Sequence, residues 1–241
     1  MRIAVVQPVP LFDDLAGSCG AIVDRMRWAE TNAIDLLLFP EAYLLGHSYD
    51  RATIRRRAAA IGQGGLATLC DRLRGFAPTL VVGAFECDGD MLSNRALVIE
   101  RGVVRGRYAK AFPNEPGVTA GVDFPVFERS GVRFGINICN DANHAAPAAK
   151  LAAQGATLLL YPLNNMLRTD TAQRWRERSL DNLVLRARQT GCWIASADVV
   201  GTAGALVSHG CSAIVSPAGE VVARVPEDEA GVALFDLPPA A

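Results

Sequence analysis

Hydrophobic residues in this chain occur in two patterns, short continuous runs and longer stretches with helical spacing. Residues 3–7, 34–39 and 80–85 form largely apolar runs, which are typical of buried strands. Between the first two runs, apolar residues recur mostly every three or four positions and therefore share one face of a helix. The residues on that face are Cys19, Ile22, Val23, Met26, Ala29 and Ala33.

The alternation of strands and helices continues to the end of the chain. An arginine- and alanine-rich helix is predicted over residues 51–74, with an interruption at the glycines between positions 62 and 65. A tight turn at Arg101-Gly102 joins two strands into a hairpin. Further strands are predicted at 94–100, 103–108, 132–138, 157–161, 192–199, 211–216, 220–224 and 232–235, and helices at 145–153 and 171–189. This order predicts a single α/β domain over residues 1–241, with two sheets and the helices outside them.

Composition narrows the classes of partner. Half of the 241 residues are hydrophobic, a fifth are charged, and the formal net charge is −1, so nothing favours nucleic acid or an anionic membrane. No apolar run approaches the roughly 20 residues of a membrane span, and the N-terminus lacks the apolar core of a signal peptide. The six cysteines and three histidines show no metal-ligand spacing. We therefore expect free thiols, a cytoplasmic location, no metal, and a small molecule as the partner.

Three chemically capable residues directly follow predicted strands. Glu41 comes after the run 36–40, Lys110 after 103–109 and Cys139 after 132–138. Ligands of α/β proteins bind at the carboxyl ends of strands, so these side chains are candidates for a common site on neighbouring strand ends. Each alone has an ordinary explanation, such as a buried thiol or a solvated lysine. Lysine is nevertheless rare here, because Lys110 and Lys150 are the only two among 24 basic residues.

Together, the three residues would form a complete site for acyl transfer without histidine. A thiol attacks a carbonyl or nitrile carbon efficiently only when a base accepts its proton, and Glu41 can serve as that base. The same carboxyl group can then protonate a leaving amine. The ammonium of Lys110 and the backbone N–H of Asn140 would stabilise the oxyanion that forms when Cys139 attacks.

Three sequence blocks surround these candidate residues. The first is Phe39-Pro40-Glu41 followed by Gly46 and Tyr49. The second is Ser93-Asn94…Gly102…Tyr108-Ala109-Lys110, and the third is Phe124-Pro125-Val126-Phe127…Gly131…Gly135…Ile138-Cys139-Asn140-Asp141. In this order, the blocks resemble the nitrilase superfamily of carbon–nitrogen hydrolases, the first its F-P-E…G-Y region and the third its nucleophile block.

The resemblance implies an α-β-β-α sandwich in which Glu41, Lys110 and Cys139 form a Glu-Lys-Cys catalytic triad. Members of the superfamily cleave non-peptide C–N bonds in amides, carbamoyl compounds or nitriles without a metal or organic cofactor, and they usually form homodimers or larger homo-oligomers. Many use a second glutamate beyond the lysine, and Glu115 is the candidate here.

Several residues near the expected pocket depart from the pattern or are candidates for substrate binding. Asn140 stands where an aromatic or other bulky residue commonly follows the cysteine, and Asp198 stands where asparagine is frequent. The asparagine-rich loop after residue 162 is positioned to line the mouth of the pocket, although asparagine is also a common turn residue. The candidate substrate-binding residues are Asn143, Asn164, Asn165 and Arg168.

The leading hypothesis is an amidase-type hydrolase that cleaves a small amide or N-carbamoyl compound through a cysteine thioester and releases ammonia or an amine. A nitrilase, or an enzyme that transfers the acyl group to an acceptor other than water, would use the same residues. A catalytically silent homologue that binds a ligand is the alternative outside enzymes. A serine hydrolase is disfavoured because no G-x-S-x-G turn follows a strand.

Overall fold

The computed structural model describes residues 1–239, and its centre consists of two six-stranded sheets. The order in one sheet is β15-β1-β2-β3-β4-β5 and in the other β14-β13-β10-β8-β7-β6. The strands are β1 (Arg2–Gln7), β2 (Leu36–Leu38), β3 (Thr79–Asp88), β4 (Met91–Glu100), β5 (Val103–Ala109), β6 (Val126–Arg129), β7 (Val132–Ile136), β8 (Leu158–Pro162), β9 (Leu167–Arg168), β10 (Trp193–Ala197), β11 (Gly201–Ala203), β12 (Leu206–Ser208), β13 (Ala213–Val215), β14 (Val221–Arg224) and β15 (Gly231–Asp236). The α-helices are α1 (Leu15–Thr31), α2 (Arg51–Ala60), α3 (Leu66–Leu73), α4 (Ala145–Ala153) and α5 (Thr169–Thr190).

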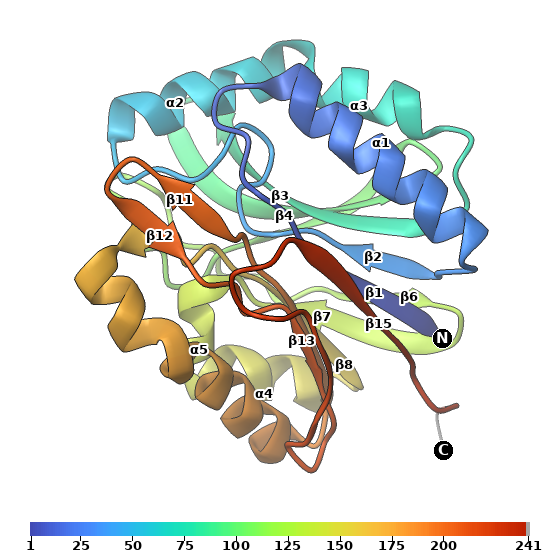
Figure 1. Ribbon diagram of the computed structural model, residues 1–241. Coiled ribbons are helices and arrows are strands. Elements are labelled where there is room, and N and C mark those ends of the chain that lie inside the picture. The colour runs from blue at the N-terminus through green and yellow to red at the C-terminus, as the bar shows by residue number, and fades with distance from the viewer. Residues whose placement is uncertain (240–241) are drawn as a thin grey trace.

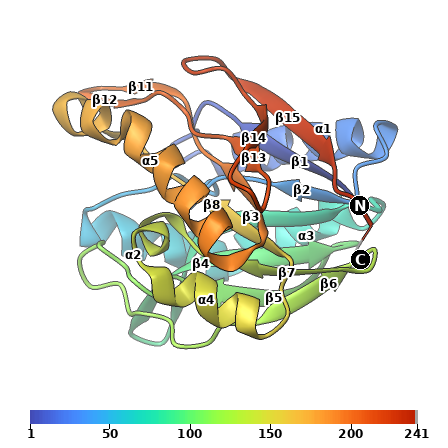
Figure 2. The ribbon, with the colours of Figure 1, turned by 90° about the horizontal axis from the view of Figure 1, so that it is seen from below.

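Helices cover the outer face of each sheet (Figure 1). Helices α1, α2 and α3 lie on one side of the molecule, and α4 and α5 lie on the opposite side. Seen from below, α4 and α5 lie in front of the sheets and the other three helices lie behind them (Figure 2). The layers therefore follow the order helix, sheet, sheet, helix. This confirms the predicted α-β-β-α sandwich.

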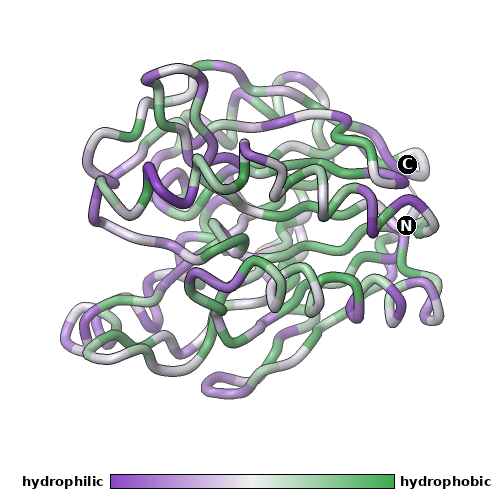
Figure 3. The backbone as a smooth tube through the Cα atoms, turned by 90° about the horizontal axis from the view of Figure 1, so that it is seen from above, coloured by the Kyte–Doolittle hydropathy of each residue, from purple (hydrophilic) through white to green (hydrophobic). Residues whose placement is uncertain are grey.

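Alternating side chains of the strands explain why the layers stack in this way. In β1, Ala4 and Val6 pack against α1 and α3, whereas Ile3 and Val5 point toward the second sheet. Successive side chains of a strand point to opposite faces, so an entirely apolar strand has both of its faces buried. The tube coloured by hydropathy shows hydrophobic stretches along the interior strands, with many of the hydrophilic stretches in the outer loops (Figure 3).

The centre of each sheet is parallel. Strand β2 pairs in parallel with β1 and β3, and β8 pairs in parallel with β7 and β10. Strand β5 runs in the same direction as β3, because β4 pairs antiparallel with both. The carboxyl ends of β2 and β5 therefore lie at the same edge of their sheet.

The predicted interruption of the long helix is confirmed, and its cause is local. A π-helical segment, Ile61–Gly65, separates α2 from α3, and Gln63 and Gly64 leave the helical conformation within it. Gly64 has a φ of +118°, a value that residues other than glycine rarely adopt.

Four short strands were not predicted from the sequence. Strand β6 pairs with β7, and β9, β11 and β12 form a separate three-stranded sheet. They have between two and four residues each, too few for an alternating pattern to stand out. No helix within residues 1–239 has the length and apolar character needed to cross a membrane.

Candidate active site

Glu41 lies just beyond β2, where the chain passes close to β3. Its backbone N–H donates to the carbonyl of Leu163, which follows β8 of the other sheet, at 3.1 Å. A Cβ atom at Gly83 of β3 would lie 2.7 Å from the Cα of Glu41 and 2.2 Å from the nitrogen of Ala42. Only glycine allows this close approach without a shift of the backbone, and the approach holds the carboxylate between the two sheets.

Lys110 directly follows β5 and is almost completely buried, with 1 % of its surface exposed. Its N–H donates to the carbonyl of Asn94 on β4, and its own carbonyl accepts from Gly121. Its Nζ atom lies 2.7 Å from Oε1 of Glu41 and 2.9 Å from Oε1 of Glu115. A buried ammonium requires such partners, so the two carboxylates account for its position.

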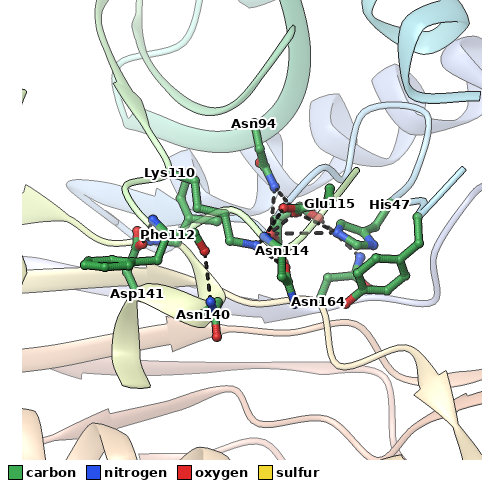
Figure 4. A network of polar contacts seen from close by, with 12 residues as sticks. His47, Asn94, Lys110, Phe112, Asn114, Glu115, Asn140, Asp141 and Asn164 are labelled. Atoms are coloured by element: carbon green, nitrogen blue, oxygen red, sulfur yellow. Dashed lines mark hydrogen bonds and ion pairs between the residues drawn. The ribbon is translucent and has the colours of Figure 1, made fainter. Parts of the chain in front are cut away.

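Two further side chains complete this cluster (Figure 4). The amide nitrogen of Asn94 donates to Oε1 of Glu41 and to Oε1 of Glu115, each at 2.7 Å. Nε2 of His47 lies 2.9 Å from Oε1 of Glu115 and 3.9 Å from Oε1 of Glu41. We call Glu41, His47, Asn94, Lys110 and Glu115 the charged cluster.

Cys139 begins a short 3₁₀ helix, Cys139–Asn143, after β7. Its φ is +42°, in the left-handed region that residues other than glycine seldom adopt. Asp141 holds this turn, because its carboxylate accepts hydrogen bonds from the N–H of Ile138, the N–H of Phe112 and the hydroxyl of Tyr108, all at 2.8 Å. Strain of this kind is found where the surroundings enforce a functional geometry.

Burial and charge act together on the ionisable groups. Burial raises the pKa of the Cys139 thiol well above its usual value, and the carboxylate of Glu41 raises it further, against the opposing charge of Lys110. Burial alone would lower the pKa of Lys110, but Glu41, Cys139 and Glu115 together raise it. Burial would raise the pKa of Glu115, yet its contacts with His47 and Lys110 lower it well below the usual value. The cluster therefore favours a charged lysine beside a protonated thiol.

Three members of the charged cluster are possible metal ligands. Glu41, His47 and Glu115 each offer one ligand atom, and these atoms lie within 4.8 Å of one another. The same two Oε1 atoms already contact the ammonium of Lys110. A metal ion would have to displace this cation, so the donor set fits a lysine better than a metal.

A pocket of about 180 Å³ opens above Cys139. This is smaller than the roughly 300–1,000 Å³ of pockets that hold drug-sized ligands. Cys139 is one of its lining residues, and the asparagines that line it are Asn114, Asn140, Asn143, Asn164, Asn165 and Asn182. Leu163, Leu167 and Trp175 contribute apolar surface. Glu41 and Lys110 lie behind this wall and are buried.

The structure brings together most of the site residues predicted from the sequence. Glu41, Lys110 and Glu115 are in direct contact, and Asn140, Asn143, Asn164 and Asn165 line the pocket with Cys139. Arg168 does not line it and is exposed, so its predicted place in the pocket is wrong. It is the last residue before α5, in a two-residue strand at the surface.

The expectation of three neighbouring strand ends also needs correction. Strands β3 and β4 separate β2 from β5, and β7 belongs to the other sheet. The residues after β2, β5 and β7 meet because the two sheets are stacked face to face. Sequence reasoning assigned no role to His47 or Asn94, although His47 closely follows Glu41 and Asn94 stands in one of the recognised blocks.

A buried lysine between two carboxylates, next to a strained cysteine at the base of a pocket, has the character of an enzyme active site. Residues 2–241 match the carbon–nitrogen hydrolase family, so this chain belongs to that family and is a nitrilase-superfamily enzyme. The predicted family membership is confirmed.

Two similar proteins agree with the assignment to this family. A nitrilase from Pyrococcus abyssi is 29 % identical, over 98 % of this chain and 90 % of the relative. A glutamine-dependent NAD(+) synthetase from Xylella fastidiosa is 30 % identical over 92 % of this chain, which spans only 41 % of that longer protein.

Among solved structures, an amidase from Nesterenkonia sp. superposes with a TM-score of 0.87 at 26 % identity, covering 99 % of this chain and 90 % of that one. One structure of that amidase carries the acetamide moiety of fluoroacetamide covalently at its active-site cysteine. Another holds butyramide.

Proposed function

We propose that this protein hydrolyses the C–N bond of a small amide or N-carbamoyl compound through a thioester on Cys139. The observation that carries the proposal is the position of Lys110, whose ammonium bridges Glu41 and Glu115 at 2.7 and 2.9 Å. The amidase from Nesterenkonia sp., with its adduct at a cysteine, supports the same chemistry.

The first half of the reaction forms the thioester. Glu41 takes the proton of the Cys139 thiol while the sulfur attacks the carbonyl carbon. The charge of Lys110 and the N–H of Asn140 stabilise the oxyanion. The oxyanion then collapses, the C–N bond breaks, and Glu41 returns its proton to the departing nitrogen, which leaves as ammonia or an amine.

The second half releases the acid. A water molecule attacks the thioester carbon while Glu41 accepts one of its protons. The C–S bond breaks, and the sulfur recovers a proton from Glu41. Because the pKa of the thiol is raised, the resting cysteine is protonated, and a base is therefore required in each turnover.

Ammonia release tests this proposal directly. Purified protein would be given small aliphatic amides, N-carbamoyl compounds and nitriles beside the variant Cys139→Ala. We expect acid and ammonia from one or more amides, and no turnover in the variant. Equal turnover in wild type and Cys139→Ala would overturn the proposal, and acid from nitriles alone would assign the nitrilase reaction instead. That second outcome has a basis in the resemblance to the nitrilase from Pyrococcus abyssi.

A further inference from the structure

The pocket above Cys139 is formed by uncharged side chains. Of the described residues that line it, none is Asp, Glu, Lys, Arg or His. A substrate bearing a carboxylate would lose its hydration there without gaining an ionic partner. Burying an unpaired charge is strongly unfavourable, so the residues that line the pocket favour neutral substrates over anionic ones.

Three asparagines form a continuous hydrogen-bonded chain along one side of this pocket. Nδ2 of Asn182 donates to Oδ1 of Asn143 at 2.6 Å, and Nδ2 of Asn143 donates to Oδ1 of Asn140 at 2.7 Å. Nδ2 of Asn140 in turn donates to the carbonyl of Phe112 at 2.9 Å. We call Asn140, Asn143 and Asn182 the amide chain. It links the residue after the nucleophile to helix α5.

The amide chain has hydrogen-bonding capacity left for a ligand. An asparagine side chain has two N–H donors and an oxygen with two acceptor positions. At Asn182, one N–H is used within the chain, while its other N–H and its Oδ1 have no partner among residues 1–239. Asn182 also lines the pocket, so these groups are available to the acyl part of a substrate.

We propose that the amide chain selects a short substrate whose acyl chain is uncharged and ends in a hydrogen-bonding group, such as a hydroxyl or a second carboxamide. This inference rests on the proposed function, because it concerns the substrate of the same site. It disfavours N-carbamoyl amino acids and amides that carry a free carboxylate.

The positions of Arg174 and Asp198 agree with a preference for uncharged substrates. Arg174 is exposed, and its Nη2 donates to Oγ1 of Thr171 at 3.2 Å from outside the wall. Behind Asn165, the carboxyl group of Asp198 is buried and accepts from the backbone and side-chain nitrogens of Asn165, at 2.9 and 2.6 Å. An anionic substrate would therefore find no cation in the pocket lining.

Three five-carbon amides of similar size test this preference. Glutaramide is neutral and ends in a second carboxamide, glutaramate ends in a carboxylate, and pentanamide ends in a methyl group. We expect kcat/KM for glutaramide to exceed that for pentanamide by about tenfold and that for glutaramate by about 100-fold or more, since the site leaves a carboxylate unpaired.

Variants of Asn182 show whether the amide chain causes this order. Asn182→Leu is expected to remove the preference, so that the ratio of kcat/KM for glutaramide to kcat/KM for pentanamide falls from about ten to about one. Asn182→Lys is expected to raise kcat/KM for glutaramate about tenfold by supplying a cation. Gln173→Lys is the matched control, because Gln173 is exposed on the same helix outside the pocket lining and should change nothing.

Two kinetic results would overturn the inference. One is a preference of the wild type for glutaramate, particularly if Arg174→Gln removes it. The other is an unchanged order of substrates in Asn182→Leu. If none of the three amides is hydrolysed, their binding to Cys139→Ala by NMR separates the two proposals. Tighter binding of glutaramide than of glutaramate would support the substrate class while counting against hydrolysis, and equal binding would overturn the substrate class.

Discussion

The Nζ atom of Lys110 lies 2.7 Å from Oε1 of Glu41, whereas Oε2 of the same carboxylate is buried and has no hydrogen-bond partner among residues 1–239. Asn94 also donates to Oε1, so one oxygen is held from two sides. Buried polar atoms are rarely left unpaired without a functional reason. In the proposed mechanism, we expect this unpaired oxygen to accept the proton from Cys139 and later from water.

Glu41→Gln tests this assignment. The amide oxygen of glutamine can still accept from Lys110 and Asn94, but the side chain cannot take a proton. We expect kcat to fall by about 10²–10⁴-fold, the usual contribution of a positioned base. Circular dichroism should show an unchanged fold. A kcat within threefold of wild type would show that another group is the base.

His47 is expected to act by positioning Glu115. Its Nε2 lies 2.9 Å from Oε1 of Glu115, and His47 does not line the pocket. His47→Leu should lower kcat by about tenfold, the value of one hydrogen bond to a charged group, and leave KM nearly unchanged. His47→Gln, which keeps a donor, should recover most of the loss. A change in KM alone would contradict the positioning role.

Asp198 should make the protein less stable at neutral pH than in mild acid. Burial raises its pKa to about 7, so between about pH 4 and pH 7 the folded state holds a proton that the unfolded state releases. The free energy of unfolding therefore falls as pH rises through this range, by up to about 4 kcal/mol, and levels off above it.

The variant Asp198→Asn isolates this effect, because the amide keeps an oxygen for the N–H groups of Asn165 and Val199. Denaturant titrations at several pH values would compare it with wild type. We expect the difference in stability, in favour of the variant, to grow from about pH 4 to pH 7 and then to stay constant. A difference that does not depend on pH would mean that Asp198 is ionised throughout.

The left-handed backbone conformation of Cys139 should lower the free energy of unfolding by a measurable amount. Its φ of +42° suits glycine better than alanine. We expect Cys139→Gly to be more stable than Cys139→Ala by about 0.5–1 kcal/mol, with both variants inactive. Ala142→Gly in the same 3₁₀ helix, where φ is not positive, should instead destabilise the protein. Urea unfolding measures all three, and a more stable Cys139→Ala would argue against strain at this position.

The layered fold and the charged residues at its centre were accessible from the sequence because local signals marked them. Apolar runs bounded by turn residues located most of the central strands. Glu41 and Cys139 follow largely apolar runs, and Lys110 follows the second strand of a predicted hairpin. Glu115 was identified as a candidate through its place beyond Lys110 within the family resemblance.

The remaining parts of the site depend on contacts that no local pattern contains. Asn94 reaches Glu41 across 53 positions of sequence, and Asn182 reaches Asn143 across 39. His47 contacts Glu115 across 68 positions of sequence. Arg168 was placed in the pocket for the same reason, because the spacing of residues along the loop does not determine whether a side chain points into the pocket or toward solvent.

The most direct test of the account is the mass of the protein during turnover. Wild type mixed with excess of a hydrolysable amide and quenched in acid should carry the acyl group of that amide on the peptide containing Cys139. The adduct should be absent from Cys139→Ala. Turnover without any adduct, together with undiminished activity in Cys139→Ala, would contradict the thioester mechanism.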